Sequence, residues 1–300
     1  MTLWIPIAIA AASFQTVRFM LQKVLSSVTL STAGATFSRF VYSAPLIWAG
    51  LLGYLAVSGQ KIPALSATFW MFATIGGTAQ ILATVCVVAL FRQRNFAVGI
   101  TFKKTEVIQT ALVGLVVLGD QITPLGWVAI VIGLCAVLVL SKTPQSKGPW
   151  WRHLSSPASL LGLGSGVLFA FSAVSYRAAS LELDALAPAF RAGVTLAIVV
   201  SLQTLFMLVW LKWREPGEIA RVWAARRVAI WVGLTSMAGS FCWFWAFTLQ
   251  NAAYVKALGQ IELLLSLLAS VLFFKEQITR REIVGMGLLI LSILALLLAI

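Results

Sequence analysis

The chain has 300 residues, of which 60% are hydrophobic and only 10% are charged. Soluble globular proteins are usually about 45–50% apolar and about 25% charged, so a single aqueous core could not bury this much apolar surface. The composition excludes a soluble enzyme, a disordered regulator, a collagen-like fibre and a secreted disulfide scaffold. We therefore expect a protein whose solvent is lipid.

The net charge is +13, from 22 Lys and Arg against 9 Asp and Glu. In a soluble protein this balance would indicate nucleic-acid binding. Here the chain contains no basic soluble domain that could carry a binding groove, and loop Lys and Arg of membrane proteins set topology and contact anionic lipid heads. We expect the lipid bilayer, and no nucleic acid, as a partner.

Cysteine and histidine give no sign of a metal or another cofactor. Cys86, Cys135 and Cys242 lie inside apolar runs, and the lone His153 lies in a polar loop. A single histidine and three scattered thiols do not make a metal cluster or a disulfide framework. We therefore predict no metal site and no cofactor.

Runs of about 20 mostly apolar residues are long enough to cross a membrane as helices. The sequence contains ten such runs, separated by short segments rich in Pro, Gly and charge. They are Leu3–Leu25, Ala33–Ser58, Ser66–Phe91, Phe96–Leu118, Thr123–Ser141, Pro157–Arg177, Ala185–Leu211, Ala224–Leu249, Val255–Phe274 and Thr279–Ile300. The fold class predicted is an all-α membrane protein with ten transmembrane helices.

The two halves of the chain resemble each other. Residues 91–140 align without a gap with residues 247–296, and the matched polar residues carry the information because apolar helices match by chance. The matches are Asn95 with Asn251, Glu106 with Glu262, and Asp120-Gln121-Ile122-Thr123 with Glu276-Gln277-Ile278-Thr279. Arg39 and Arg191 correspond as well, each as the seventh residue of the second apolar run of its half.

The repeat unit therefore has five helices, and an odd number makes the second copy enter the membrane from the opposite face. We expect a first repeat over residues 1–141, a connecting loop over 142–156 and a second repeat over 157–300. Inverted repeats of this kind place a solute site near the membrane midplane and expose it alternately to each side.

These features resemble the drug/metabolite transporter superfamily, in its ten-helix EamA-type branch. Arg39-Phe40 matches an Arg-Phe pair that is typical of the second helix, whereas Arg191-Ala192 matches only in the arginine. The family's hydrophobic-Gly-Glu-x-hydrophobic-Thr block resembles residues 274–279, with Lys275 in place of glycine and Gly285 nine residues after the glutamate. In residues 118–123 aspartate replaces the glutamate, and Ala129 replaces the later glycine.

The resemblance implies a secondary transporter, often an exporter of amino acids or other small metabolites. It also implies a cavity lined by the third, fourth, eighth and ninth helices among others. The high aromatic content is similar to that of the aromatic-amino-acid exporters of the superfamily.

The location follows from the same features. We expect an integral protein of the bacterial plasma (inner) membrane. The loop Lys and Arg concentrate in odd-numbered loops, which places both termini outside by the positive-inside rule, whereas the family habit is cytoplasmic termini. The oligomeric state is left open, and a monomer is compatible with the sequence.

Charges at membrane depth are costly and usually face a cavity or a partner. We select candidates for binding a small-molecule substrate on this ground, together with a central amide and an aromatic cluster. They are Gln80, Lys103, Lys104, Glu106, Trp243, Trp245, Lys256 and Glu262. Lys103 and Glu106 are three residues apart and could instead neutralise each other. Arg39 and Arg191 lie closer to the ends of their runs, and we expect structural, snorkelling roles for them.

The leading hypothesis is a secondary transporter that exports small metabolites, most of all amino acids and among these the aromatic ones, by alternating access. No nucleotide-binding motif is present, so the energy would come from a gradient. The alternatives are a broad-specificity drug or metabolite facilitator, a membrane-embedded lipid enzyme and a scaffold or receptor. The sequence lacks the catalytic cluster that an enzyme needs, so we predict that the protein is not an enzyme.

Overall fold

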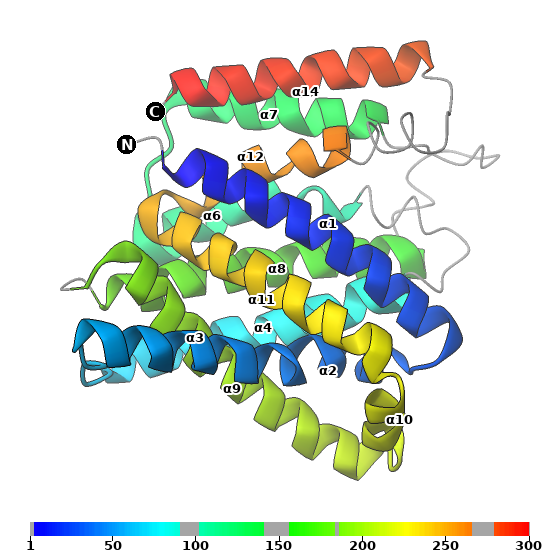
Figure 1. The fold of residues 1–300 in the computed structure, drawn as a ribbon. Helices are drawn as coiled ribbons and strands as arrows, with labels where there is room; N and C mark the ends of the chain where they lie inside the picture. The colour runs from blue at the N-terminus through cyan, green and yellow to red at the C-terminus, as the bar shows by residue number, and fades with distance from the viewer. Residues whose placement is uncertain (1–2, 91–101, 141–155, 184–185, 266–278, 300) are drawn as a thin grey trace.

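The computed structural model describes residues 3–90, 102–140, 156–183, 186–265 and 279–299. Every regular element in these ranges is a helix (Figure 1). The helices are α1 (Trp4–Val28), α2 (Thr32–Val41), α3 (Ser43–Ser58), α4 (Ala67–Leu90), α6 (Glu106–Leu118), α7 (Pro124–Leu140), α8 (Pro157–Leu181), α9 (Pro188–Arg214), α10 (Glu218–Ala224), α11 (Arg226–Leu249), α12 (Ala252–Gly259) and α14 (Arg280–Leu298).

Each of the ten apolar runs overlaps with at least one of these helices. Seven helical segments are long and apolar enough to cross a membrane, with α2 and α3 counted together, and α6 and α7 are shorter apolar helices. The run Val255–Phe274 is described only to residue 265. The expected all-helical membrane architecture is therefore confirmed, whereas the count of ten crossings and the inversion of the repeat stay predictions.

The second apolar run is divided between α2 and α3 at Tyr42. Pro45 has no N–H to donate to the carbonyl of Val41 four residues earlier, and its ring crowds that carbonyl. The helix breaks at this point, which agrees with the kink that a proline in the middle of the run predicts.

Small residues allow the most extensive helix contacts, which form between α4 and α8, α1 and α11, and α7 and α14 (Figure 1). A Cβ added to Gly76 of α4 would lie 2.8 Å from the ring of Tyr176 in α8, and one added to Gly239 of α11 would lie 3.1 Å from Phe14 of α1. A Cβ added to Gly166 of α8 would lie 2.5 Å from the side chain of Gln109 in α6. All three helix pairs join one predicted half of the chain to the other.

Two helical segments are interrupted at matched positions. Residues 102 and 103 are helical, a turn follows at Lys104 and Thr105, and α6 begins at Glu106. In the other half α12 ends at Gly259, a turn follows, and helical residues resume at Ile261. The sequence predicted one continuous helix through Glu106, and this was wrong. Broken helices at corresponding positions of two halves commonly mark the solute site of a transporter.

Candidate functional site

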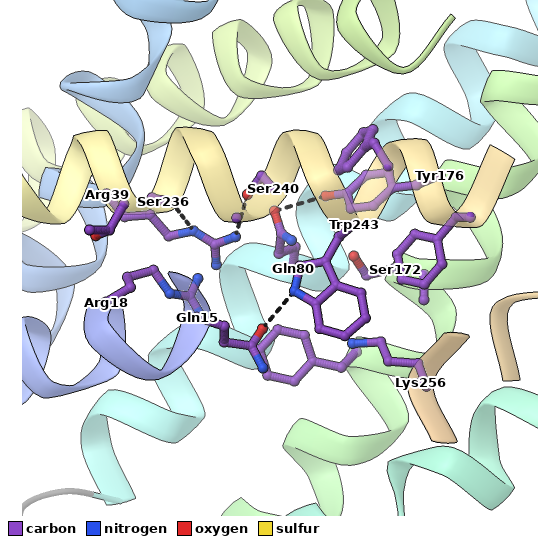
Figure 2. Close-up of a pocket in the computed structure, with 16 residues that line it drawn as sticks. Gln15, Arg18, Arg39, Gln80, Ser172, Tyr176, Ser236, Ser240, Trp243 and Lys256 are labelled. Carbon is purple, nitrogen blue, oxygen red and sulfur yellow. Dashed lines mark hydrogen bonds between the residues drawn. The ribbon is translucent and has the colours of Figure 1, made fainter. Parts of the chain in front are cut away.

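A buried pocket lies where α1, α2, α4, α8, α11 and α12 meet, so both predicted halves contribute to its wall (Figure 2). Its polar lining includes three cations, two amides and several hydroxyls, and its apolar lining is mostly aromatic. The cavity is narrow, at about 30 Å³. A water molecule needs roughly 10–15 Å³ of such space, so this conformation has room for water rather than for a metabolite.

Arg39 reaches into the pocket from α2 and is fixed by hydroxyl groups of two other helices. Its Nε donates to Ser236 Oγ at 2.8 Å, its Nη1 to Thr84 Oγ1 at 3.0 Å, and its Nη2 to Ser240 Oγ at 3.3 Å. The side chain is only 3% exposed. Arg39 therefore does not snorkel as expected, because it is buried and bonded to hydroxyl groups of α4 and α11.

Arg18 enters the same pocket from α1, on the same side as Arg39 (Figure 2). It is 3% exposed, and its guanidinium carbon lies 4.3 Å from the centre of the Phe19 ring. Its Nε and Nη2 have no hydrogen-bond partner among the described residues. Buried arginine nitrogens without a partner are costly, which makes Arg18 the least satisfied cation of the site.

The lysines and glutamates beside the pocket form ion pairs. Glu106 lies 3.1 Å from Lys256 Nζ and 3.2 Å from Lys103 Nζ, and Lys104 pairs with Glu262. The helical neighbours Lys103 and Glu106 thus neutralise each other, as their spacing suggested. In addition, each glutamate pairs with a lysine of the other predicted half. Of these residues only Lys256 lines the main pocket, and Lys104 lines a small separate one.

Aromatic rings surround the ammonium group of Lys256. Its Nζ lies 4.8 Å from the centre of the Trp243 ring, which stacks on Phe247 at 5.7 Å. Trp243 Nε1 donates to Gln15 Oε1 at 3.2 Å. Trp245 packs on Phe241 instead and does not line this pocket. The α11 helix therefore has two aromatic faces. Trp243 and Phe247 lie on the face toward the pocket, and Trp245 lies on the other.

Two amides and a phenol form a network on the α4 wall. Tyr176 Oη donates to Gln80 Oε1 at 3.1 Å, and Gln203 Nε2 donates to the same oxygen at 2.9 Å. Gln80 therefore lines the pocket and also links α4 to α8 and α9.

Some functional residues were missed by the sequence reasoning. Gln15, Tyr176 and Arg18 line the pocket and were not among the selected candidates. The sequence could have indicated Gln15 and Arg18, because they are polar residues one helical turn apart in an otherwise apolar run.

The remaining expected positions lie apart from the pocket or outside the described residues. Arg191 Nε donates to the Ser180 carbonyl at 2.9 Å, near the start of α9. Asp120 pairs with Arg177 at 3.1 Å. Asn95, His153 and residues 274–278 of the family block lie outside the described residues, and Thr279 forms a capping box with Glu282.

The comparisons with known proteins agree with this architecture. Residues 156–298 match the sequence profile of the EamA-like transporter family. A solved structure, described only as the crystal structure of a protein, superposes with a TM-score of 0.70 at 14% sequence identity, covering 99% of this chain and 96% of the other. At that identity the likeness shows the fold alone. No curated protein matches the chain.

The profile match lies within the C-terminal half of the chain and indicates the class of protein that this part resembles. Residues 156–298 are similar to transporters of the drug/metabolite transporter superfamily, which are not enzymes, and the described residues include seven helical segments long and apolar enough to cross a membrane. The family that these residues resemble is the EamA-like transporter family, a family of secondary transporters whose description does not specify the substrate.

Proposed function

We propose that this protein exports small carboxylate-bearing metabolites by alternating access, with amino acids, and among these the aromatic ones, as the first candidates. The observation that supports this proposal is the pocket between the predicted halves, which combines buried cations with stacked aromatic rings. Cationic side chains suit a carboxylate, and a ring suits an aromatic side chain. The plasma membrane of a bacterium is the location we assign to this activity.

The helix packing supports a rocking mechanism. The third apolar run of each half packs on the first run of the other half, as α4 on α8 and α11 on α1. The fifth runs, α7 and α14, pack on each other. These contacts are those expected of two five-helix units, residues 1–141 and 157–300, related by a pseudo-two-fold axis. Rocking of one unit against the other would widen the narrow pocket toward one side at a time.

The test is uptake by proteoliposomes from a mixed pool of metabolites, measured by mass spectrometry of the vesicle contents. We expect aromatic amino acids and related carboxylates to accumulate in vesicles with protein, and not in empty vesicles. Uptake of many unrelated cationic and neutral compounds would instead indicate the broad-specificity facilitator. Absence of any protein-dependent uptake of a carboxylate would refute the proposed function.

A further inference from the structure

The pocket carries more positive than negative charge. Five cations lie in or beside it, namely Arg18, Arg39, Lys103, Lys104 and Lys256. Two described carboxylates are near them, and both are already paired with lysines: Glu106 with Lys103 and Lys256, and Glu262 with Lys104. Three positive charges are left without a counter-charge among the described residues. Such a site is stabilised by an anion, because buried charge without a partner is expensive.

The unpartnered atoms of Arg18 have the geometry of an anion receptor. Nε and Nη2 lie on one edge of the guanidinium, where their N–H bonds point in nearly the same direction. Both atoms are buried and have no hydrogen-bond partner in the part of the chain that the structure describes. This edge matches the two oxygens of a carboxylate, which accept two parallel, charge-assisted hydrogen bonds. In contrast, Arg39 already donates from all three nitrogens to hydroxyl groups.

An ammonium group finds no carboxylate and no free amide oxygen in the described lining of the pocket, where the unpartnered hydroxyl of Ser172 is an acceptor without charge. The amide oxygen of Gln15 accepts from Trp243, and that of Gln80 accepts from Tyr176 and Gln203. The position over the Trp243 ring, where a cation would be attracted, is occupied by Lys256. Neither the amides nor the aromatic box therefore offers a free acceptor for a second cation.

We infer that Arg18 is the carboxylate receptor of this pocket, and that the transporter prefers aromatic organic anions without an ammonium group over zwitterionic amino acids. The inference rests on the proposed function and narrows its substrate class. Arg18 binds the carboxylate through its Nε–Nη2 edge, and Trp243 and Phe247 contact the ring of the solute. Arg39 and Lys256 contribute positive potential, which an added ammonium group would oppose.

Three probes with the same ring test the preference: 3-phenylpropionate, phenylalanine, which adds an ammonium group, and phenethylamine, which lacks the carboxylate. Binding is measured by calorimetry on the whole protein in detergent micelles, which reports the affinity of each probe separately from its transport. We expect 3-phenylpropionate to bind at least about 10-fold more tightly than phenylalanine, and phenethylamine not to bind. Equal or tighter binding of phenylalanine would overturn the preference while leaving the proposed function intact. Failure of all three probes to bind would overturn the inference, and the uptake experiment would then judge the proposed function separately.

Substitutions assign the receptor. Arg18→Gln should raise the Kd of 3-phenylpropionate by about 10- to 100-fold, the size expected for a lost charged hydrogen-bond pair. Arg18→Lys keeps the positive charge but loses the two parallel N–H donors. Its Kd should lie between those of Arg18→Gln and the unaltered protein. Arg191→Gln, which removes an arginine outside the pocket, is the matched control and should bind like the unaltered protein. If Arg18→Gln and Arg191→Gln bind the probe equally well, Arg18 is not the receptor. The comparison of the three probes needs no variant and stands even if Arg18→Gln fails to fold.

Discussion

Glu106 forms ion pairs with two lysines at the point where the predicted halves meet. Its substitution tests whether these ion pairs hold the two halves together. Lys103 Nζ lies 3.2 Å and Lys256 Nζ 3.1 Å from its carboxylate oxygens, and all three side chains are at most 8% exposed. Removing one partner of a buried ion pair usually costs about 3–5 kcal/mol, because the other charge stays buried without compensation. We expect Glu106→Gln to lower the free energy of unfolding by about this amount.

The assay is reversible unfolding in mixed micelles, followed by tryptophan fluorescence. A second variant, Glu106→Gln with Lys256→Gln, removes one of the stranded charges and should recover part of the loss, which the double-mutant cycle reports as coupling. Glu182→Gln is the control, because Glu182 is an exposed acid bonded to Ser66. Its expected cost is below about 1 kcal/mol. If Glu106→Gln costs no more than this control, the ion pairs do not hold the halves together.

Three further predictions follow from particular contacts. Gly76→Ala should destabilise the protein by about 1–3 kcal/mol in the same unfolding assay, because its Cβ would lie 2.8 Å from the Tyr176 ring. In a cysteine-free background, Ser240→Cys at the pocket should react with a water-soluble thiol reagent. Val116→Cys on the exposed apolar surface should not react. Equal labelling of the two variants would contradict a hydrated pocket. Thr279→Ala should cost about 1 kcal/mol through loss of the capping box, measured against Thr279→Ser, which keeps the cap.

The transmembrane character of the chain could be predicted closely. Apolar runs such as Ser66–Phe91 and Pro157–Arg177 became α4 and α8 with similar bounds, because a spanning helix satisfies its own backbone hydrogen bonds and needs no tertiary partner. The sequence did not predict the break in the helix before Glu106. A turn before Glu106 interrupts the helix expected there. The turn residues are Lys104 and Thr105, and neither is a proline or a glycine that would predict a break.

The candidate site could be predicted only in part. Lys256, Gln80 and Trp243 were selected from the sequence and do meet in one pocket, whereas Trp245, selected on the same ground, lies on another face of α11. Arg39 was expected to snorkel and instead donates to three hydroxyls. A sequence shows that a residue is polar within an apolar run, and it does not show the rotation of that helix about its axis.

The sequence by itself determined the solvent of this protein and the position of its helices, because both follow from the length and hydrophobicity of local runs. Only the tertiary structure decided which charges meet. The pairs Lys256–Glu106 and Lys104–Glu262 join residues about 150 positions apart, and Arg18 meets the pocket residues of α11 only in the folded chain, where α1 packs on α11. Such pairings depend on how two units pack, and packing is a property of the whole chain that no local pattern of residues contains.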